Sequence, residues 1–256
     1  MDFFFTFFAA FFILLVWIWF SWRPVFPKEF YLSTPMFFGH RGALHRAPEN
    51  TLSSYKAAID AGLRAIEMDV VSTKDGKVVC SHNVDLERET DGKGFFNEVE
   101  WENLEIVRTG YRSHPNKTDR LYLLEEITNE LPENIRLNIE IKSKSILDIQ
   151  TAMSVGKMIT SGKIKQNVIV SSFNPMVIRV VKWIDKNIPT GFIIDQENIH
   201  LKWCMYWAHP DCLHPTAEFV DEAFMDFAKK KELAVNVWTV NTKPAIAWLK
   251  KRNVHG

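Results

Sequence analysis

Acidic and apolar side chains alternate in residues 65–72, which read AIEMDVVS. Successive side chains of a β-strand point to opposite faces, so Glu67 and Asp69 share one face and apolar residues occupy the other. Such a strand has one face in a hydrophobic core and one face in a polar environment. The stretch therefore predicts a strand whose polar face carries two carboxylates.

A second stretch with the same pattern lies at residues 135–141, IRLNIEI, and continues into Lys142. Here Asn138, Glu140 and Lys142 fall on one face. An edge strand with a solvated face is one interpretation. The other is a barrel in which both strands direct charged side chains into the lumen, where buried charge must be paired or bound to a metal.

Strand-like and helix-like stretches alternate along the chain, as in a parallel sheet covered by helices. We expect strands over 36–40, 65–72, 78–81, 135–141, 168–172, 190–194 and 234–239, and helices over 50–61, 123–131, 146–160, 175–185, 201–208, 218–231 and 244–252. Residues 83–121 are polar and poorly periodic, which indicates a long loop or small insertion. The pattern predicts an α/β fold of the TIM-type (β/α)₈ barrel class over 36–256.

The N-terminus is compositionally different from the rest of the chain. Residues 3–22 carry no charge, and Trp17, Trp19 and Trp22 gather at the end of the run, as interfacial aromatics do. About 20 apolar residues span a hydrocarbon core. We interpret 1–24 as a single transmembrane anchor and the proline-rich 25–35 as a linker; a signal peptide and a buried soluble helix remain alternatives.

Charge and cysteine content bear on partners and location. The 256 residues are 46% apolar with a formal net charge of zero, so the chain has no electrostatic footprint for nucleic acid. Three cysteines match no zinc spacing and favour free thiols. Arg23 and Lys28 follow the apolar run, and the positive-inside rule then places the folded domain in the cytoplasm.

Several polar residues close the expected strands, where barrel active sites lie. His40 and His82 each end a strand, and two imidazoles suit phosphodiester cleavage as general base and general acid. Arg41 and Lys142 are suited to binding phosphate oxygens. The three carboxylates on the polar faces would repel one another, and a hard divalent cation, Ca²⁺ or Mg²⁺, relieves that repulsion; they are Glu67, Asp69 and Glu140.

Taken together, these motifs resemble the glycerophosphodiester phosphodiesterase family. The matching segments are His40-Arg41-Gly42, Pro48-Glu49-Asn50-Thr51, Glu67-Met68-Asp69-Val70, Asp75-Gly76, His82, Glu140-Ile141-Lys142 and Val235-Asn236-Val237-Trp238-Thr239-Val240-Asn241. The resemblance covers about residues 36–256. It implies a TIM-type barrel, a Ca²⁺ or Mg²⁺ ion, and hydrolysis of glycerophosphodiesters to glycerol 3-phosphate and an alcohol.

The resemblance also assigns roles to individual residues. Catalysis is assigned to His40 and His82, the metal to Glu67, Asp69 and Glu140, and phosphate contacts to Arg41 and Lys142. We expect Trp238 to bind substrate at the pocket mouth together with Phe173, although a core role suits both rings. Asn50 opens a helix and reads as its N-cap.

Two other functions remain open. A membrane anchor holds the barrel near lipid, which suits a lysophospholipase D that releases lysophosphatidic acid from lysophospholipids. A truncated, inactive membrane-tethered binding protein is the second alternative, and the complete set of catalytic residue types argues against it. The oligomeric state is left open by the sequence.

Barrel closure is the last question. Without the short stretch 78–81, which only runs on from residues 65–72 after a turn, six barrel strands are expected, and a weak one at residues 211–214 makes seven. A (β/α)₈ barrel has eight. Family members typically continue from a Gly such as Gly256 into another apolar strand, and His255 stands where the family commonly has Asp. We expect a barrel that lacks its last strand and is open between its first and last strands; a misread strand near 211–214 is the alternative.

Overall fold

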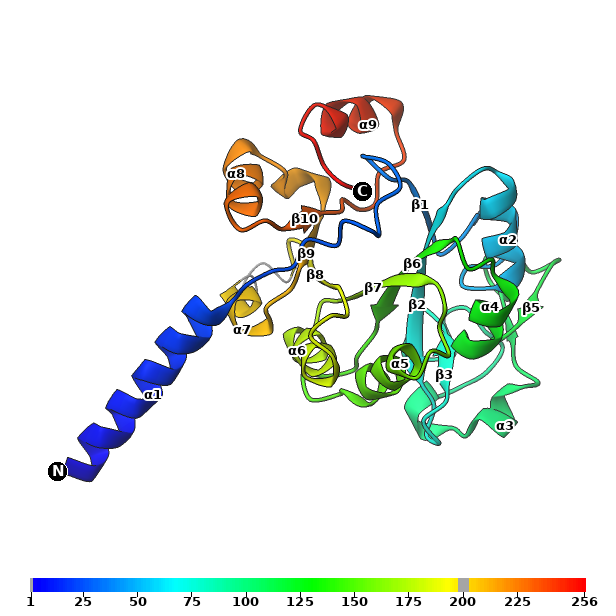
Figure 1. The fold of residues 1–256 in the computed structure, drawn as a ribbon. Coiled ribbons are helices and arrows are strands. Elements are labelled where there is room, and N and C mark those ends of the chain that lie inside the picture. Colours follow the sequence, from blue (N-terminus) through cyan, green and yellow to red (C-terminus); the bar gives the residue numbers. More distant parts are fainter. Residues whose placement is uncertain (1, 198–202) are drawn as a thin grey trace.

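A computed structural model describes residues 2–197 and 203–256, and its centre is a curled, mainly parallel sheet (Figure 1). Seven strands run parallel in the order β1, β2, β6, β7, β8, β9, β10, and β3 pairs antiparallel with β2. Their bounds are β1 Phe38–His40, β2 Ala65–Ser72, β3 Val78–Cys80, β6 Arg136–Ile141, β7 Asn167–Ser172, β8 Thr190–Ile194, β9 Cys212–Pro215 and β10 Ala234–Val235. The expected α/β fold of TIM type is confirmed.

Helices cover the outside of this sheet (Figure 1). They are α2 Leu52–Asp60, α4 Leu124–Glu130, α5 Gln150–Thr160, α6 Pro175–Ile184, α7 Met205–Ala208, α8 Glu222–Lys230 and α9 Lys243–Lys250, with a short 3₁₀ helix at Ala217–Phe219. The helix expected over 201–208 begins partly outside the described residues. The local sequence specifies where α6 begins, because Asn174 caps the helix and Pro175 occupies its first turn.

The register between β2 and β6 positions the polar faces. Glu67 pairs with Asn138 and Asp69 pairs with Glu140, and all eight residues of β2 are buried. Burial on both faces is typical of parallel strands beneath helices. The charged faces of both strands therefore point into the curled sheet at neighbouring positions.

The sheet is open between β10 and β1 in the part of the chain that the structure describes. The last residues lie in this gap: the N–H of His255 donates to Val235 O at 2.8 Å, and the N–H of Met36 donates to His255 O at 2.8 Å. A weak strand at 211–214 is real, since β9 forms there, but it is one of the seven. The described residues form no continuous ring of eight parallel strands.

Residues 83–121 form a small folded insertion. It contains a 3₁₀ helix at Phe96–Glu98, helix α3 Trp101–Leu104, and the two-stranded sheet of β4 Arg108–Thr109 and β5 Asp119–Arg120. Leu86, Phe96 and Leu104 form its apolar centre and pack against Val71 and Val79 of the main sheet. Its apolar residues are too irregularly spaced to reveal this packing in the sequence.

Helix α1, Asp2–Ser21, extends away from the barrel as a rod (Figure 1). Residues 4–21 of it are long and apolar enough to cross a membrane, and none of those whose side chains the structure describes is buried in the protein. The chain then turns beneath the sheet. There Phe30 packs with Ala65 and Ala234, the first residues of β2 and β10, and its carbonyl accepts from Arg136 Nε at 3.0 Å.

Candidate active site

Three carboxylates meet inside the curled sheet. One oxygen each of Glu67, Asp69 and Glu140 lies within 4.8 Å of the other two, and all three residues are buried. Glu67 and Asp69 are brought together by strand periodicity, and Glu140 joins them through its pairing with Asp69. The structure thus brings together the three residues that the sequence proposes as metal ligands.

Two cationic side chains partly balance this charge. Lys142 Nζ contacts Glu140 and lies 3.0 Å from Asp69 Oδ1. Arg41 Nε lies 3.3 Å from Asp69 Oδ2, and its Nη1 lies 2.9 Å from Glu49 Oε2. When Glu49, Glu67, Asp69 and Glu140 are all ionised, the two cations leave two negative charges uncompensated, which matches the charge of one divalent cation.

Burial governs how these acids ionise. Desolvation, reinforced by Asp69 and Glu140, raises the pKa of Glu67 well above its usual range. Burial likewise raises the pKa of Glu140 to about 7. Asp69 is different: although burial opposes ionisation, Lys142, His82 and Arg41 lower its pKa. A cation among the three would favour ionisation of both glutamates.

The donor set fits a hard divalent ion. Glu67 Oε1 is buried and accepts no hydrogen bond from the described residues, while Glu67 Oε2 accepts from the backbone N–H of Arg41 at 2.9 Å. A buried carboxylate oxygen without a donor is costly unless a cation binds it. Oxygen ligands of this kind suit Ca²⁺ or Mg²⁺. The cluster could therefore bind a metal, in line with the sequence expectation.

The two histidines stand at strand ends beside the carboxylates. His40 ends β1, with Nε2 3.9 Å from Glu67 Oε2, and His82 follows β3, with Nδ1 3.1 Å from Asn83 Oδ1. Burial lowers the pKa of His40 to about 4, helped by Arg41, and burial lowers the pKa of His82 to about 4, helped by Lys142. Both imidazoles are thus neutral near pH 7 and able to accept a proton.

Two residues of the loop before α2 contact the site, although neither of them was assigned a role there from the sequence. Glu49 forms the ion pair with Arg41. The interpretation of Asn50 as an N-cap is wrong: Thr51 caps α2 by accepting from the N–H of Ser54, whereas the side chain of Asn50 hydrogen-bonds Asp69. The only sequence signal was their place in the motif Pro48-Glu49-Asn50-Thr51.

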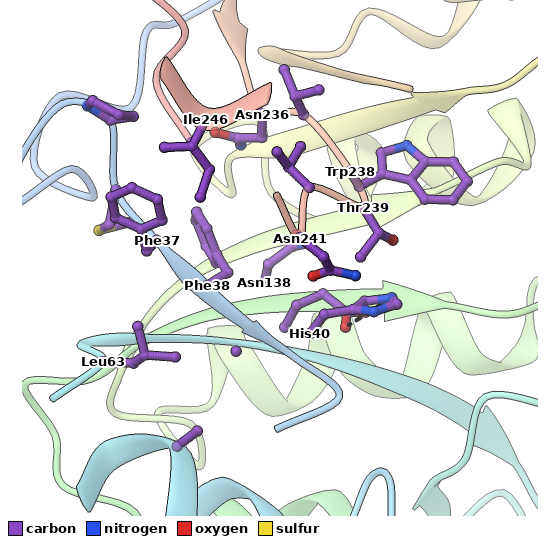
Figure 2. Close-up of a pocket in the computed structure, with 18 of the residues that line it drawn as sticks. Phe37, Phe38, His40, Leu63, Asn138, Asn236, Trp238, Thr239, Asn241 and Ile246 are labelled. Carbon is purple, nitrogen blue, oxygen red and sulfur yellow. Dashed lines mark ion pairs between the residues drawn. The ribbon is translucent and has the colours of Figure 1, made fainter. Parts of the chain in front are cut away.

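A cavity of about 510 Å³ opens beside these groups, and Glu67, Asn138 and Glu140 form part of its wall. Figure 2 shows His40 and Trp238 at one end of it and the apolar side chains of Phe37 and Leu63 at the other. The cavity therefore combines a charged end, suited to a phosphodiester, with an apolar end.

Trp238 is held in place by two contacts. Its Nε1 donates to His214 O at 2.8 Å, and its ring meets Phe173 edge-on with centroids 5.6 Å apart. The Phe173 ring in turn lies 5.9 Å from Lys142 Nζ. The expected pair of rings is thus found at the charged end of the cavity, next to a proposed phosphate ligand.

Known proteins resemble this chain in sequence. The sequence pattern of the Glycerophosphoryl diester phosphodiesterase family matches residues 40–256. A glycerophosphodiester phosphodiesterase of Caldanaerobacter subterraneus subsp. tengcongensis is 28% identical over 226 residues, which are 85% of this chain and 90% of that protein. Glycerophosphodiester phosphodiesterase 1 of Homo sapiens is 26% identical over 238 residues, covering 79% of this chain and 71% of that protein.

Solved structures give the same picture of the fold. A phosphodiesterase of Oleispira antarctica, in complex with the product sn-glycerol-3-phosphate, superposes with a TM-score of 0.76 at 23% identity, covering 86% of this chain and 91% of that one. A glycerophosphodiester phosphodiesterase of Thermotoga maritima superposes with a TM-score of 0.66 at 27% identity, covering 86% and 92%.

Proposed function

This chain belongs to the glycerophosphoryl diester phosphodiesterase family and is a phosphoric diester hydrolase, and we propose that it hydrolyses glycerophosphodiesters to glycerol 3-phosphate and an alcohol. We propose that the reaction uses a divalent cation and two histidines. The observation that carries the proposal is the buried cluster of Glu67, Asp69 and Glu140 beside His40 at one cavity wall. A bound cation would supply positive charge that stabilises the phosphoryl oxygens as negative charge builds on them.

The charged side chains divide the remaining work. Arg41 presents a planar fork and Lys142 a point charge, and we assign to both the binding of phosphate oxygens, which would position the phosphorus. Their ion pairs with Glu49, Asp69 and Glu140 hold the two cations in place. Positioning of this kind lowers the activation barrier, because the substrate loses its translational and rotational freedom on binding and not in the transition state.

Proton transfer falls to His40 and His82. One neutral imidazole accepts a proton from the attacking nucleophile, and the other, protonated once the anionic phosphodiester lies beside it, donates a proton to the leaving alcohol oxygen. An adjacent negative charge raises an imidazole's pKa, so substrate binding itself prepares the acid. The P–O bond to the alcohol breaks and the phosphate stays with the glycerol.

The bond that breaks can be read from the products. Glycerophosphocholine incubated with the enzyme in ¹⁸O-labelled water should give choline and glycerol 3-phosphate, with the label on the phosphate, by mass spectrometry. Phosphocholine with free glycerol would contradict the proposal, because cleavage would then be on the other side of phosphorus.

A lysophospholipase D activity is the second candidate, and the apolar end of the cavity favours it. Phe37, Phe38 and Leu63 line this end, facing Ile246 of α9. A single acyl chain is the part of a lysophospholipid that such a surface would bury. Comparing the kcat/KM for lysophosphatidylcholine with that for glycerophosphocholine separates the two substrates; equal values would remove any role for the apolar wall.

We further propose that α1 is a retained, single-pass membrane anchor and that the barrel lies in the cytoplasm. Trp22, just past α1, is 1% exposed in the core and donates from Nε1 to Pro210 O at 2.9 Å, so cleavage after α1 would disturb the domain. Arg23 and Lys28 on the barrel side favour the cytoplasmic face. Protease digestion of sealed right-side-out vesicles tests this; loss of the barrel to external protease would contradict it.

A further inference from the structure

A cluster of aromatic side chains surrounds the point where α1 joins the barrel. We define the aromatic face as Trp19 of α1, Trp183 of α6, and Trp203, Tyr206 and Trp207 at α7. Trp19 stacks on Tyr206 with centroids 3.5 Å apart, and Trp183 meets Trp207 edge-on at 6.2 Å. The two groups of rings come from three separate elements and meet at α7, where Tyr206 and Trp207 are consecutive residues.

Much of the aromatic face is exposed. Trp183 is 63% exposed and Trp203 is 59% exposed. Exposed large aromatics gathered on one surface are uncommon on soluble proteins and indicate an interaction site. The face is continuous with α1, and none of the residues 4–21 whose side chains the structure describes is buried. The partner of the aromatic face is therefore the same medium into which the apolar helix α1 inserts.

Basic groups lie among the rings. The guanidinium of Arg179 is 5.5 Å from the Trp183 ring and 5.8 Å from the Trp207 ring, and the ammonium of Lys231 is 5.9 Å from the Tyr206 ring. Tryptophan and tyrosine prefer the headgroup level of a bilayer, where the ring is in a less polar layer and the N–H or O–H stays hydrated. Arginine and lysine complement lipid phosphates there.

The junction is also held firmly enough to define an orientation. Arg179 Nη1 donates to His209 Nδ1 at 3.1 Å, and His209 Nε2 donates to Ile18 O, near the end of α1, at 2.8 Å. This chain of hydrogen bonds joins α6, α7 and α1. A helix connected to the barrel in this way cannot insert in a membrane without bringing the α6–α7 surface towards the lipid.

We propose that the aromatic face is a bilayer-docking surface, which seats the barrel on phospholipid headgroups through α6 and α7 in addition to the anchor. This inference rests on the proposed anchoring by α1. It assigns Trp183 and Trp207 to the headgroup layer and Arg179 to lipid phosphates. The barrel then has one fixed side towards the membrane.

The test uses the full chain in vesicles of phosphatidylcholine and phosphatidylglycerol, with and without bromine on acyl carbons close to the headgroup. Tryptophan emission is compared for the wild type, the double variant W183F/W207F and the control W248F. Trp248 of α9 is a matched control because it is also partly exposed and carries a guanidinium, that of Arg252, 3.6 Å from its ring. Unchanged glycerophosphocholine turnover checks that each variant is folded.

The emission of Trp183 and Trp207 is the difference between the wild type and W183F/W207F, and we expect brominated lipid to quench it. The emission of Trp248, which is the difference between the wild type and W248F, should not be quenched. Resistance to carbonate extraction, measured on the same vesicles, reports on α1 alone. If the protein resists carbonate extraction but bromine does not affect the emission of Trp183 and Trp207, the docking surface is wrong and the anchor is still supported. Water or a second copy of the chain would then cover these two rings. Carbonate-extracted protein without quenching would overturn both.

Discussion

Asn50 forms two hydrogen bonds with Asp69. Its Nδ2 donates to Asp69 Oδ2 at 2.9 Å, and its Oδ1 accepts from the backbone N–H of Asp69 at 2.9 Å. The hydroxyl of Tyr55 donates to the same Oδ1 at 2.9 Å, which fixes the amide orientation. Asn50 thereby holds the orientation of a carboxylate that also contacts Arg41 and Lys142.

Replacing Asn50 by glycine should weaken cation binding by about 10–100-fold, the usual effect of losing a partner that orients a metal ligand. Glycine is the appropriate replacement because Asn50 has a φ of 56°, which glycine adopts without strain. Activity measured against metal concentration gives the shift. Asn253→Gly is the control, since Asn253 is exposed and has a φ of 57°. Equal metal dependence in the two variants would remove the positioning role.

The second prediction concerns proton transfer. His82→Ala should lower kcat by roughly 10²–10⁴, the scale of a lost general acid or base. His114→Ala, in the insertion, should leave turnover unchanged, because among the described residues its ring hydrogen-bonds the neighbouring Ser113 alone, at the surface. Steady-state kinetics on glycerophosphocholine measure both, and near-normal kcat in His82→Ala would eliminate its role.

A third prediction follows from the raised pKa values of Glu67 and of Glu140, the latter about 7. A folded-state pKa above the unfolded value gives stability that is lost as pH rises through the folded pKa. In chelator, the Tm should therefore fall between pH 6.5 and 8. The pKa of His40 and His82, lowered to about 4, places their effect below pH 6.5, outside this window.

Adding Mg²⁺ or Ca²⁺ should abolish that fall, because a bound cation favours the ionised carboxylates. Glu140→Gln should make the slope in chelator shallower. Thermal unfolding followed by circular dichroism at each pH gives the comparison. A Tm that is flat or rises over this window in chelator would contradict burial of ionising glutamates.

Trp22 connects the helix to the folded domain. Trp22→Ala should lower the free energy of unfolding by about 3–5 kcal/mol, the usual cost of truncating a buried aromatic side chain. Trp248→Ala, at an exposed ring of α9, should cost much less. Denaturant titrations in detergent compare the two variants, and equal losses would show that Trp22 contributes nothing special to the core.

The sequence was most informative where secondary structure is regular. Strand periodicity placed Glu67 with Asp69 and Asn138 with Glu140, and the structure joins the two pairs by strand register. The roles of Glu49 and Asn50 were missed because they lie in an irregular turn with positive φ at Asn50, where periodicity carries no information.

Long-range closure was harder to predict. The seven strands were counted correctly, yet nothing in the sequence shows that His255 hydrogen-bonds both Val235 and Met36 in the gap of the sheet. The aromatic residues of α6 and α7 gave no signal in the sequence either, since the contacts of Tyr206 with Trp19 and of Trp207 with Trp183 depend on tertiary packing. Local pattern predicts elements, whereas contacts between distant ends follow from the fold.

Metal dependence of turnover shows whether the cluster of Glu67, Asp69 and Glu140 works by binding a cation. Release of glycerol 3-phosphate from glycerophosphocholine is measured for the wild type and Glu67→Gln in excess chelator and after adding Mg²⁺ or Ca²⁺. We predict that chelator abolishes wild-type activity, that one of the two ions restores it, and that excess metal restores Glu67→Gln only partly. Full wild-type turnover in excess chelator would contradict it.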